Sequence, residues 1–193
     1  MNGNFMNLEL KNKLKYLALL NAIIEPEWEY RYYSYNSKWG DAEEMASLRD
    51  GCGGEWFVWF YNESIAFKCT SPVDGLVDNF QTLKDKVPRD YSIFLNEPAF
   101  SMDMGSCIWF LNNDCWQKLG NSISDLPNPE TIQKMKAKDF CEFVDEIYEQ
   151  EINCDLVAKI FDGKFEIEMA SKINPNIDLT CLKEELLEIG LST

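Results

Sequence analysis

The chain has 193 residues, and its 33 acidic side chains outnumber 18 basic ones, which gives a formal charge of −15 at neutral pH. This charge argues against nucleic acid or an anionic membrane surface as a partner, because both are polyanions, and it favours a basic protein. The chain has no histidine, so catalysis of the Ser-His-Asp or Cys-His type and the histidine-containing zinc sites are excluded.

The first quarter of the chain predicts a helix, an aromatic strand and a short second helix. Leucines and other apolar residues recur at helical spacing over 7–24. The following segment, 27–35, is dense in aromatic residues and alternates them with charged ones, which is typical of a strand. Asp41 and Glu44 stand three residues apart, as in a capping box, so we expect a short helix over 41–50.

The middle of the chain predicts two β-hairpins. The strands 55–61 and 64–70 are separated by a two-residue connection, and the first of them is apolar on both faces, so we expect it to be central in its sheet. A second hairpin is expected from 106–111 and 115–119. Between the hairpins, 89–95 has the pattern of a short helix.

The end of the chain is helical in pattern. A Ser- and Pro-rich loop over 121–129 precedes helices expected at 139–151, at about 166–174, and from Asp178 to Gly190. The predicted fold class is therefore α+β: a central antiparallel sheet of about four or five strands, with an N-terminal helix and a C-terminal helical tail packed on it.

The domain organisation follows from the length and from this change of character. Apolar residues make up 46% of the chain, which is too many for a disordered protein. The length suits one domain with at most a small appendage. We expect an α+β body over 1–125 and an acidic helical region over 126–193 that packs on it as part of the same domain.

The seven cysteines and the first residues bear on the compartment. No two cysteines have the C-x-x-C spacing of a zinc ribbon, and neither a secretory signal nor an apolar run long enough to span a bilayer is visible. We therefore predict a cytoplasmic protein with reduced thiols and without a bound metal or cofactor. Cys107 and Cys115 are the pair expected to face each other across a hairpin, and Cys52, between glycines, is the best candidate for a reactive thiolate.

Three segments resemble a set of uncharacterised bacterial proteins of similar length. The first is Tyr30-Arg-Tyr-Tyr-Ser-Tyr-Asn-Ser-Lys-Trp39, the second is Glu97-Pro-Ala-Phe-Ser101, and the third is Asn174-Pro-Asn-Ile-Asp-Leu179. The resemblance covers most of the chain and implies no activity. The size, the acidity and the lack of a catalytic set are also similar to bacterial immunity proteins, by analogy alone.

The aromatic segment and its surroundings supply the candidate binding residues. Tyrosine and tryptophan offer a large contact area with a polar tip, as recognition surfaces do, but the same side chains also suit a core. Arg31 is expected either to form a buried ion pair with Glu43, Glu44 or Asp50, or to bind an anion at the edge of a pocket. The candidates are Arg31, Tyr32, Tyr33, Asn36, Trp39, Arg49 and Trp56.

Carboxylates supply two further hypotheses. Glu97, Asp103 and Asp114 fall in expected loops, where two of them could meet to hold a metal or to act as a catalytic pair, although their spacing does not argue for it. Residues 139–193 hold 14 acidic and 4 basic side chains, so two-thirds of the excess negative charge lies there. On the expected helix 139–151, one outer face carries the acidic residues Asp139, Glu142, Glu146 and Glu149.

Two functions are compatible with these patterns. The first is a binding protein that masks a basic protein partner, as an immunity protein masks a toxin, with Glu142, Glu146 and Glu149 on its docking face. The alternative is a small-molecule binder or a histidine-free enzyme, with a pocket formed by the side chains Arg31, Arg49, Tyr32 and Trp56. A solvated acidic face and an aromatic core would explain the same residues without either function.

Overall fold

A computed structural model describes residues 3–192 of the chain, with side chains from residue 7 onward. Its centre is an antiparallel sheet of six strands in which every strand pairs with its neighbours in sequence, in the order β1-β2-β3-β4-β5-β6. The strands are β1 (Tyr33–Gly40), β2 (Glu43–Arg49), β3 (Glu55–Tyr61), β4 (Ser64–Thr70), β5 (Cys107–Asn112) and β6 (Cys115–Gly120). The predicted α+β class with an antiparallel sheet is confirmed, but the sheet has six strands and not four or five.

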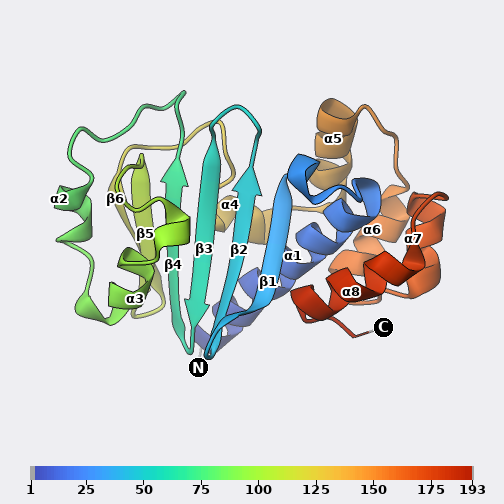
Figure 1. Cartoon of the computed structure of the whole chain (residues 1–193), viewed down its shortest axis with the longest axis horizontal. Coiled ribbons are helices and arrows are strands. Elements are labelled where there is room, and N and C mark those ends of the chain that lie inside the picture. The colour runs from blue at the N-terminus through green and yellow to red at the C-terminus, as the bar shows by residue number, and fades with distance from the viewer. Residues whose placement is uncertain (1–2, 193) are drawn as a thin grey trace.

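Helices cover the two faces of the sheet and one of its ends (Figure 1). The long α1 (Gly3–Ile24) lies on one face, and the connection from β4 to β5 folds over the other. That connection contains the short helices α2 (Gln81–Lys84), η2 (Arg89–Tyr91), α3 (Ser92–Leu95) and η3 (Pro98–Phe100). The helices after the sheet are α4 (Pro129–Lys134), α5 (Ala137–Tyr148), α6 (Cys154–Phe161), α7 (Ile167–Ile173) and α8 (Leu179–Ile189).

The sheet has more strands than expected because one segment predicted to be a helix is a strand. The segment expected as a helix over 41–50 is β2, which is paired on both sides, with Ala46 opposite Tyr35 in β1 and opposite Val58 in β3. A capping-box spacing is a local signal, and the ladders on both sides override it here. The expected strand over 27–35 is also shifted, because η1 (Trp28–Tyr30) is a 3₁₀ turn and β1 begins at Tyr33.

The hairpin predictions are confirmed, and β3 is central. Trp56, Val58 and Phe60 belong to the buried cluster on the α1 side of the sheet, whereas Phe57 and Trp59 belong to the cluster under α2, α3 and η3. All five side chains are at most 2% exposed. A strand that is apolar on both faces therefore lies between two cores, as the period-2 alternation of side chains requires.

The helices after the sheet gather beside α1 and β1 (Figure 1). Phe140 and Val144 of α5 and Leu182 and Leu186 of α8 join the same buried cluster as α1. The helices expected near 139–151, 166–174 and 178–190 are present as α5, α7 and α8. No helix among residues 3–192 combines the length and the apolarity needed to cross a membrane.

The cysteines are not all free thiols. A disulfide joins Cys141 of α5 to Cys154 at the start of α6, which contradicts the expectation that all seven are reduced. Cys107 does not face Cys115 either: it lies opposite Gly120 in β6 and opposite Cys69 in β4. The pairing partner of a strand residue depends on register, and sequence spacing alone did not fix it.

Candidate functional site

Several of the predicted site residues line a groove on the sheet. It opens on the face of β1 and β2 at the edge of the cover formed by η3, and its cavity volume is about 230 Å³. Its lining residues are Trp28, Ser34, Tyr35, Asn36, Trp39, Met45, Ser47, Arg49, Phe57, Ala99 and Glu188. Three of the candidates from the sequence, Asn36, Trp39 and Arg49, therefore meet in one place.

A row of planar groups connects several lining residues of this groove through the buried ring of Phe100. The Trp39 ring stacks on Phe100, with centroids 5.8 Å apart, and Phe100 stacks on Phe57 at 5.1 Å. The guanidinium of Arg49 then lies 5.8 Å from the Phe57 centroid and 5.2 Å from the Trp28 centroid. Two segments singled out in the sequence, 30–39 and 97–101, thus contact each other through Trp39 and Phe100.

The polar groups of the groove come mainly from β1 and β2. The hydroxyls of Ser34 and Ser47 lie 2.7 Å apart across the ladder, and the Asn36 side-chain oxygen accepts a hydrogen bond from the Lys38 backbone N–H. Within the described residues, Arg49 makes no ion pair and no hydrogen bond through its guanidinium. Those donors therefore face the groove or water.

Glu188 of α8 is the acidic member of the groove lining. Burial raises the pKa of its carboxyl, the neighbouring Glu185 carboxylate raises it further, and Arg31 partly opposes this. A carboxyl in this setting is protonated more readily than an exposed glutamate. It therefore adds less fixed negative charge to the groove as the pH falls.

Arg31 is not part of the groove lining. Its Nη1 pairs with Glu185 Oε2 at 2.7 Å, and its Nε and Nη2 donate to the carbonyls of Glu25 and Pro26. Arg31 therefore forms a partly buried ion pair, but the expected partners Glu43, Glu44 and Asp50 were wrong, since its partner is Glu185. This ion pair connects the turn before β1 to α8.

The remaining aromatic candidates pack away from Arg49. Trp56 is fully buried on the α1 side of the sheet, and the Tyr33 ring lies 6.0 Å from it. The Tyr32 hydroxyl donates to the Asp50 carbonyl, and its ring contacts Phe143 at 5.3 Å. The four side chains of the alternative pocket, Arg31, Arg49, Tyr32 and Trp56, therefore do not line one cavity.

The acidic candidates lie on α5 and at its C-terminal end. Glu142, Glu146 and Glu149 are all exposed, and Glu142 forms an exposed ion pair with Lys138 at 3.2 Å. The helix ends at Tyr148, and Glu149 takes the left-handed conformation that closes it. The three carboxylates are accessible to a partner, and α5 belongs to the C-terminal group of helices, in a segment that carries two-thirds of the excess negative charge.

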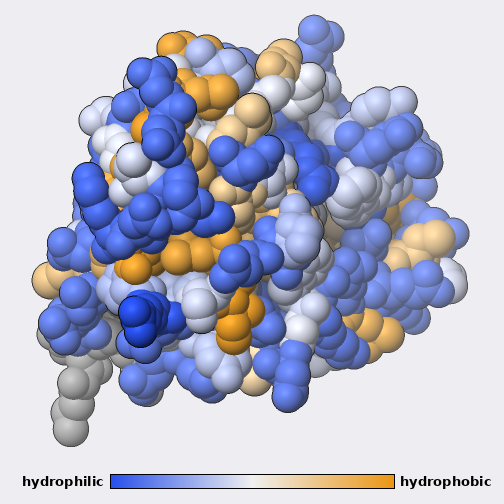
Figure 2. Space-filling view, turned by 60° about the vertical axis from the view of Figure 1, so that its left-hand side comes forward, coloured by the Kyte–Doolittle hydropathy of each residue, from blue (hydrophilic) through white to orange (hydrophobic). Residues whose placement is uncertain are grey.

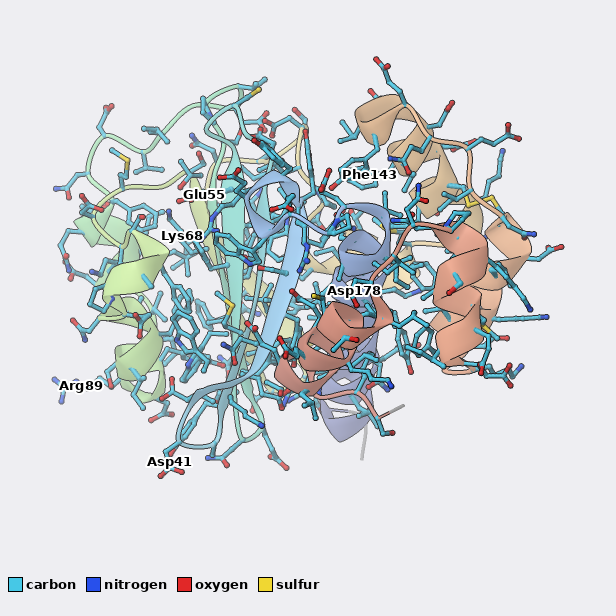
Figure 3. All side chains as sticks on the ribbon, turned by 45° about the vertical axis from the view of Figure 1, so that its right-hand side comes forward. Asp41, Glu55, Lys68, Arg89, Phe143 and Asp178 are labelled. Atoms are coloured by element: carbon cyan, nitrogen blue, oxygen red, sulfur yellow. A yellow bond between two sulfur atoms is a disulfide. The ribbon has the colours of Figure 1, made fainter. Side chains whose placement is uncertain are left out.

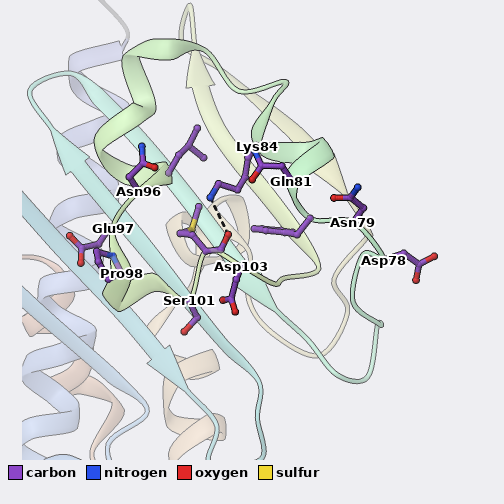
Figure 4. A pocket seen from close by; sticks show the side chains of 12 residues that line it. Asp78, Asn79, Gln81, Lys84, Asn96, Glu97, Pro98, Ser101 and Asp103 are labelled. Atoms are coloured by element: carbon purple, nitrogen blue, oxygen red, sulfur yellow. Dashed lines mark hydrogen bonds between the residues drawn. The ribbon is translucent and has the colours of Figure 1, made fainter.

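A second, wider cleft lies between α2 and the α3–η3 segment (Figure 4). Its volume is about 540 Å³, and Glu97 and Asp103 both line it, together with Lys84, whose Nζ donates to the Met102 carbonyl at 3.2 Å. Asp114 lies in the turn between β5 and β6 and is not among the lining residues. Among the described residues, no group of three or more Cys, Asp or Glu side chains is arranged to hold a metal ion.

From the side of α2 and α3, the surface is largely hydrophilic, with separate hydrophobic groups between the polar ones (Figure 2).

Exposed Cys52, the expected reactive thiol, lies in the turn before β3, where its backbone N–H donates to the Asp50 carboxylate. This contact fixes the turn and supplies no base for the thiol.

Sequence reasoning missed two features. Trp28 was placed in a strand, although its position in a turn leaves it 55% exposed over Arg49. Lys68 in β4 is fully buried, with its Nζ 2.5 Å from Thr70 Oγ1 and 3.3 Å from Glu55 Oε1 (Figure 3). A lysine within the apolar run of a strand was the available signal for such a buried cation.

Comparison of the chain with protein-family models, curated proteins and solved structures found no match. The resemblance based on segments 30–39, 97–101 and 174–179 therefore stays a prediction. Functional conclusions rest on the geometry of the groove, of the cleft and of the acidic helices.

Proposed function

We propose that this chain is a binding protein for a basic protein partner, and that it masks this partner in the manner of an immunity protein. The observation that carries the proposal is an exposed aromatic pair beside the acidic helices. Trp28 and Tyr30 are 55% and 62% exposed, and the Tyr30 carbonyl oxygen lies 3.4 Å from the Tyr148 hydroxyl of α5. Exposed Trp and Tyr side chains are the residue types enriched at the energetic centres of interfaces.

Exposed carboxylates adjoin this pair and suit a cationic surface, although the Arg49 guanidinium also lies 5.2 Å from the Trp28 centroid. Glu27 and Glu29 flank Trp28 in the turn and are exposed, and Glu185 of α8 is bonded to the neighbouring Arg31. The α5 carboxylates repel one another at helical spacing, which costs the free helix a few tenths of a kcal/mol per pair. A basic partner would relieve that repulsion and would be attracted over a distance set by the ionic strength.

The first test identifies the partner by position. A photo-crosslinking phenylalanine analogue is introduced in host cells at Trp28, at Glu146, or at Ile93, which is 43% exposed on α3. We expect positions 28 and 146 to capture the same basic protein and position 93 to capture none. No shared product from 28 and 146, or an acidic one, would contradict the proposal.

The second test measures association with that purified partner. Changing Glu142, Glu146 and Glu149 to Lys should slow association about tenfold or more at low salt, and the difference should shrink at high salt. The matched control changes Asp78, Asp85 and Asp90, which are exposed at the other end of the sheet, to Lys. If the stopped-flow association rate falls equally in both variants, net charge causes the effect and α5 is not part of the interface.

A further inference from the structure

Arg49 has unusual surroundings for a cation in so acidic a chain. Arg31 and Lys68, whose side chains are 5% and 0% exposed, pair with Glu185 and Glu55, whereas Arg49 is exposed. Arg49 instead lies over the rings of Trp28 and Phe57, at 5.2 and 5.8 Å, and no carboxylate of the described residues pairs with it. Contacts of this kind with the two rings leave the N–H donors of the guanidinium unused.

Apart from the Glu188 carboxylate, which also lines the groove, the unused polar groups are mainly donors. The guanidinium offers its N–H groups, and the Ser34–Ser47 pair has two hydroxyl hydrogens of which one is used between them. The Asn36 side-chain oxygen is already occupied by the Lys38 N–H, so its NH₂ group is the free part. A set rich in donors is matched by a ligand group rich in acceptors, such as a carboxylate.

The apolar groups of the groove are flat and closely spaced. Its lining includes the rings of Trp28, Trp39 and Phe57 and the side chain of Met45. The volume of about 230 Å³ is below the roughly 300–1,000 Å³ of sites for drug-sized ligands. The ligand is therefore small, and ring stacking on tryptophan favours a planar body.

We propose that this groove binds a small organic anion with a flat apolar body, an aromatic carboxylate in chemical class. The carboxylate accepts hydrogen bonds from Arg49 and from the Ser34–Ser47 and Asn36 donors, and the ring lies between Trp28 and Trp39. The negative charge of the whole protein slows the approach of such an anion, but it is screened beyond about 8 Å at physiological salt, whereas the Arg49 contact is direct. Binding of this anion does not require the basic protein partner, although both proposals involve Trp28.

The experiment uses three probes of one shape: indole-3-acetate, the cation tryptamine, and the neutral indole-3-methanol. Isothermal titration of the whole protein at pH 7.5 in 150 mM salt should show saturable binding of indole-3-acetate, with a dissociation constant of about 1 mM or lower. Indole-3-methanol and tryptamine should bind at least about tenfold more weakly. Equal affinity for the three probes, or no binding of indole-3-acetate at 10 mM, overturns the proposal.

Two variants test whether the anion binds at Arg49. Arg49→Met keeps an unbranched side chain over the rings and removes the charge, so it should weaken indole-3-acetate binding about tenfold to a hundredfold and leave indole-3-methanol unchanged. Arg89→Met, which removes an exposed arginine of η2, should change neither affinity. Unchanged indole-3-acetate affinity in Arg49→Met, with native circular dichroism, would show that the anion binds elsewhere and would refute the assignment.

Discussion

Lys68 shows how a single buried charge is accommodated in this fold. Its side chain is fully buried on the face of the sheet that η3 and its neighbours cover, and its Nζ bonds Thr70 and Glu55. Gly105 lies so close that a Cβ there would meet the Lys68 Cε at 3.0 Å and the Phe80 ring at 2.7 Å. The absence of a side chain at position 105 therefore makes room for both.

The first prediction concerns the pH dependence that Lys68 causes. Burial lowers the pKa of its ammonium, and Glu55 only partly opposes this. Between that lowered pKa and the unfolded value of about 10.4, the unfolded chain binds more protons than the folded one, so the free energy of unfolding rises with pH. Below the folded pKa, the whole destabilising effect is present.

Urea melts of wild type and Lys68→Met at pH 7, 8, 9 and 10 measure this effect. We expect the stability of wild type relative to Lys68→Met to increase toward pH 10, because methionine has no proton to lose. Lys86→Met, which changes an exposed lysine, is the control and should follow wild type at every pH. If the difference in unfolding free energy between wild type and Lys68→Met stays constant with pH, the lowered pKa of Lys68 is contradicted.

At the scale of elements, local patterns predicted the hairpins well and the flanks of the sheet poorly. The strands β3, β4, β5 and β6 are joined by tight connections or carry strong apolar runs, so their signal lies within a few residues. The identity of β2 depends on β1 and β3 on either side, and its short run of Met45-Ala-Ser-Leu48 fits a helix equally well. Sheet pairing decided between the two, and no local pattern contains that information.

The second prediction concerns the Arg31–Glu185 ion pair, which connects the turn before β1 to α8. Arg31 is 5% exposed and Glu185 is 28% exposed, so the pair is only partly screened by water. Arg31→Ala should lower the free energy of unfolding by about 1–3 kcal/mol, because it also leaves the Glu25 and Pro26 carbonyls without their donor. Glu185→Gln should cost less, since the two carbonyl bonds remain.

Urea denaturation of both single variants and of the double variant separates the ion pair from the carbonyl bonds. We expect a coupling energy of about 0.5–2 kcal/mol between Arg31 and Glu185. The matched control is the exposed pair Lys138–Glu142, whose coupling should be about 0.5 kcal/mol or less. Equal coupling energies in the two pairs would mean that burial does not strengthen the Arg31–Glu185 ion pair.

At the scale of the whole molecule, the candidate site was predictable only in part. Asn36, Trp39 and Arg49 were expected to matter because their residue types suit recognition, and the structure brings them together in the groove. The contact of Trp39 with Phe100 joins residues that are far apart in the chain, and it depends on how the β4–β5 connection folds over the sheet. Trp56 was expected beside Arg49, but the alternation of side chains along β3 turns it to the other face.

The third prediction follows from the uneven charge of the molecule. The 14 acidic side chains of residues 139–193 lie largely on helices grouped at one end of the sheet, so repulsion is concentrated there. Salt shortens the Debye length from about 30 Å at 0.01 M to about 10 Å at 0.1 M, which weakens repulsion between exposed charges. We expect the urea midpoint of wild type to rise between 10 and 500 mM NaCl.

Neutral variants show whether α5 is the source of that repulsion. Changing Asp145 to Asn and Glu146 and Glu149 to Gln should raise stability at 10 mM NaCl by about 0.5–1 kcal/mol and reduce the further gain from salt. Neutralising Asp78, Asp85 and Asp90 at the other end should have less effect, because fewer acidic residues surround them. Equal salt responses in all three proteins would mean that α5 carries no excess repulsion. The basic-partner proposal would then lose the energetic reason for its docking face, because relief of that repulsion is what a cationic surface contributes on binding.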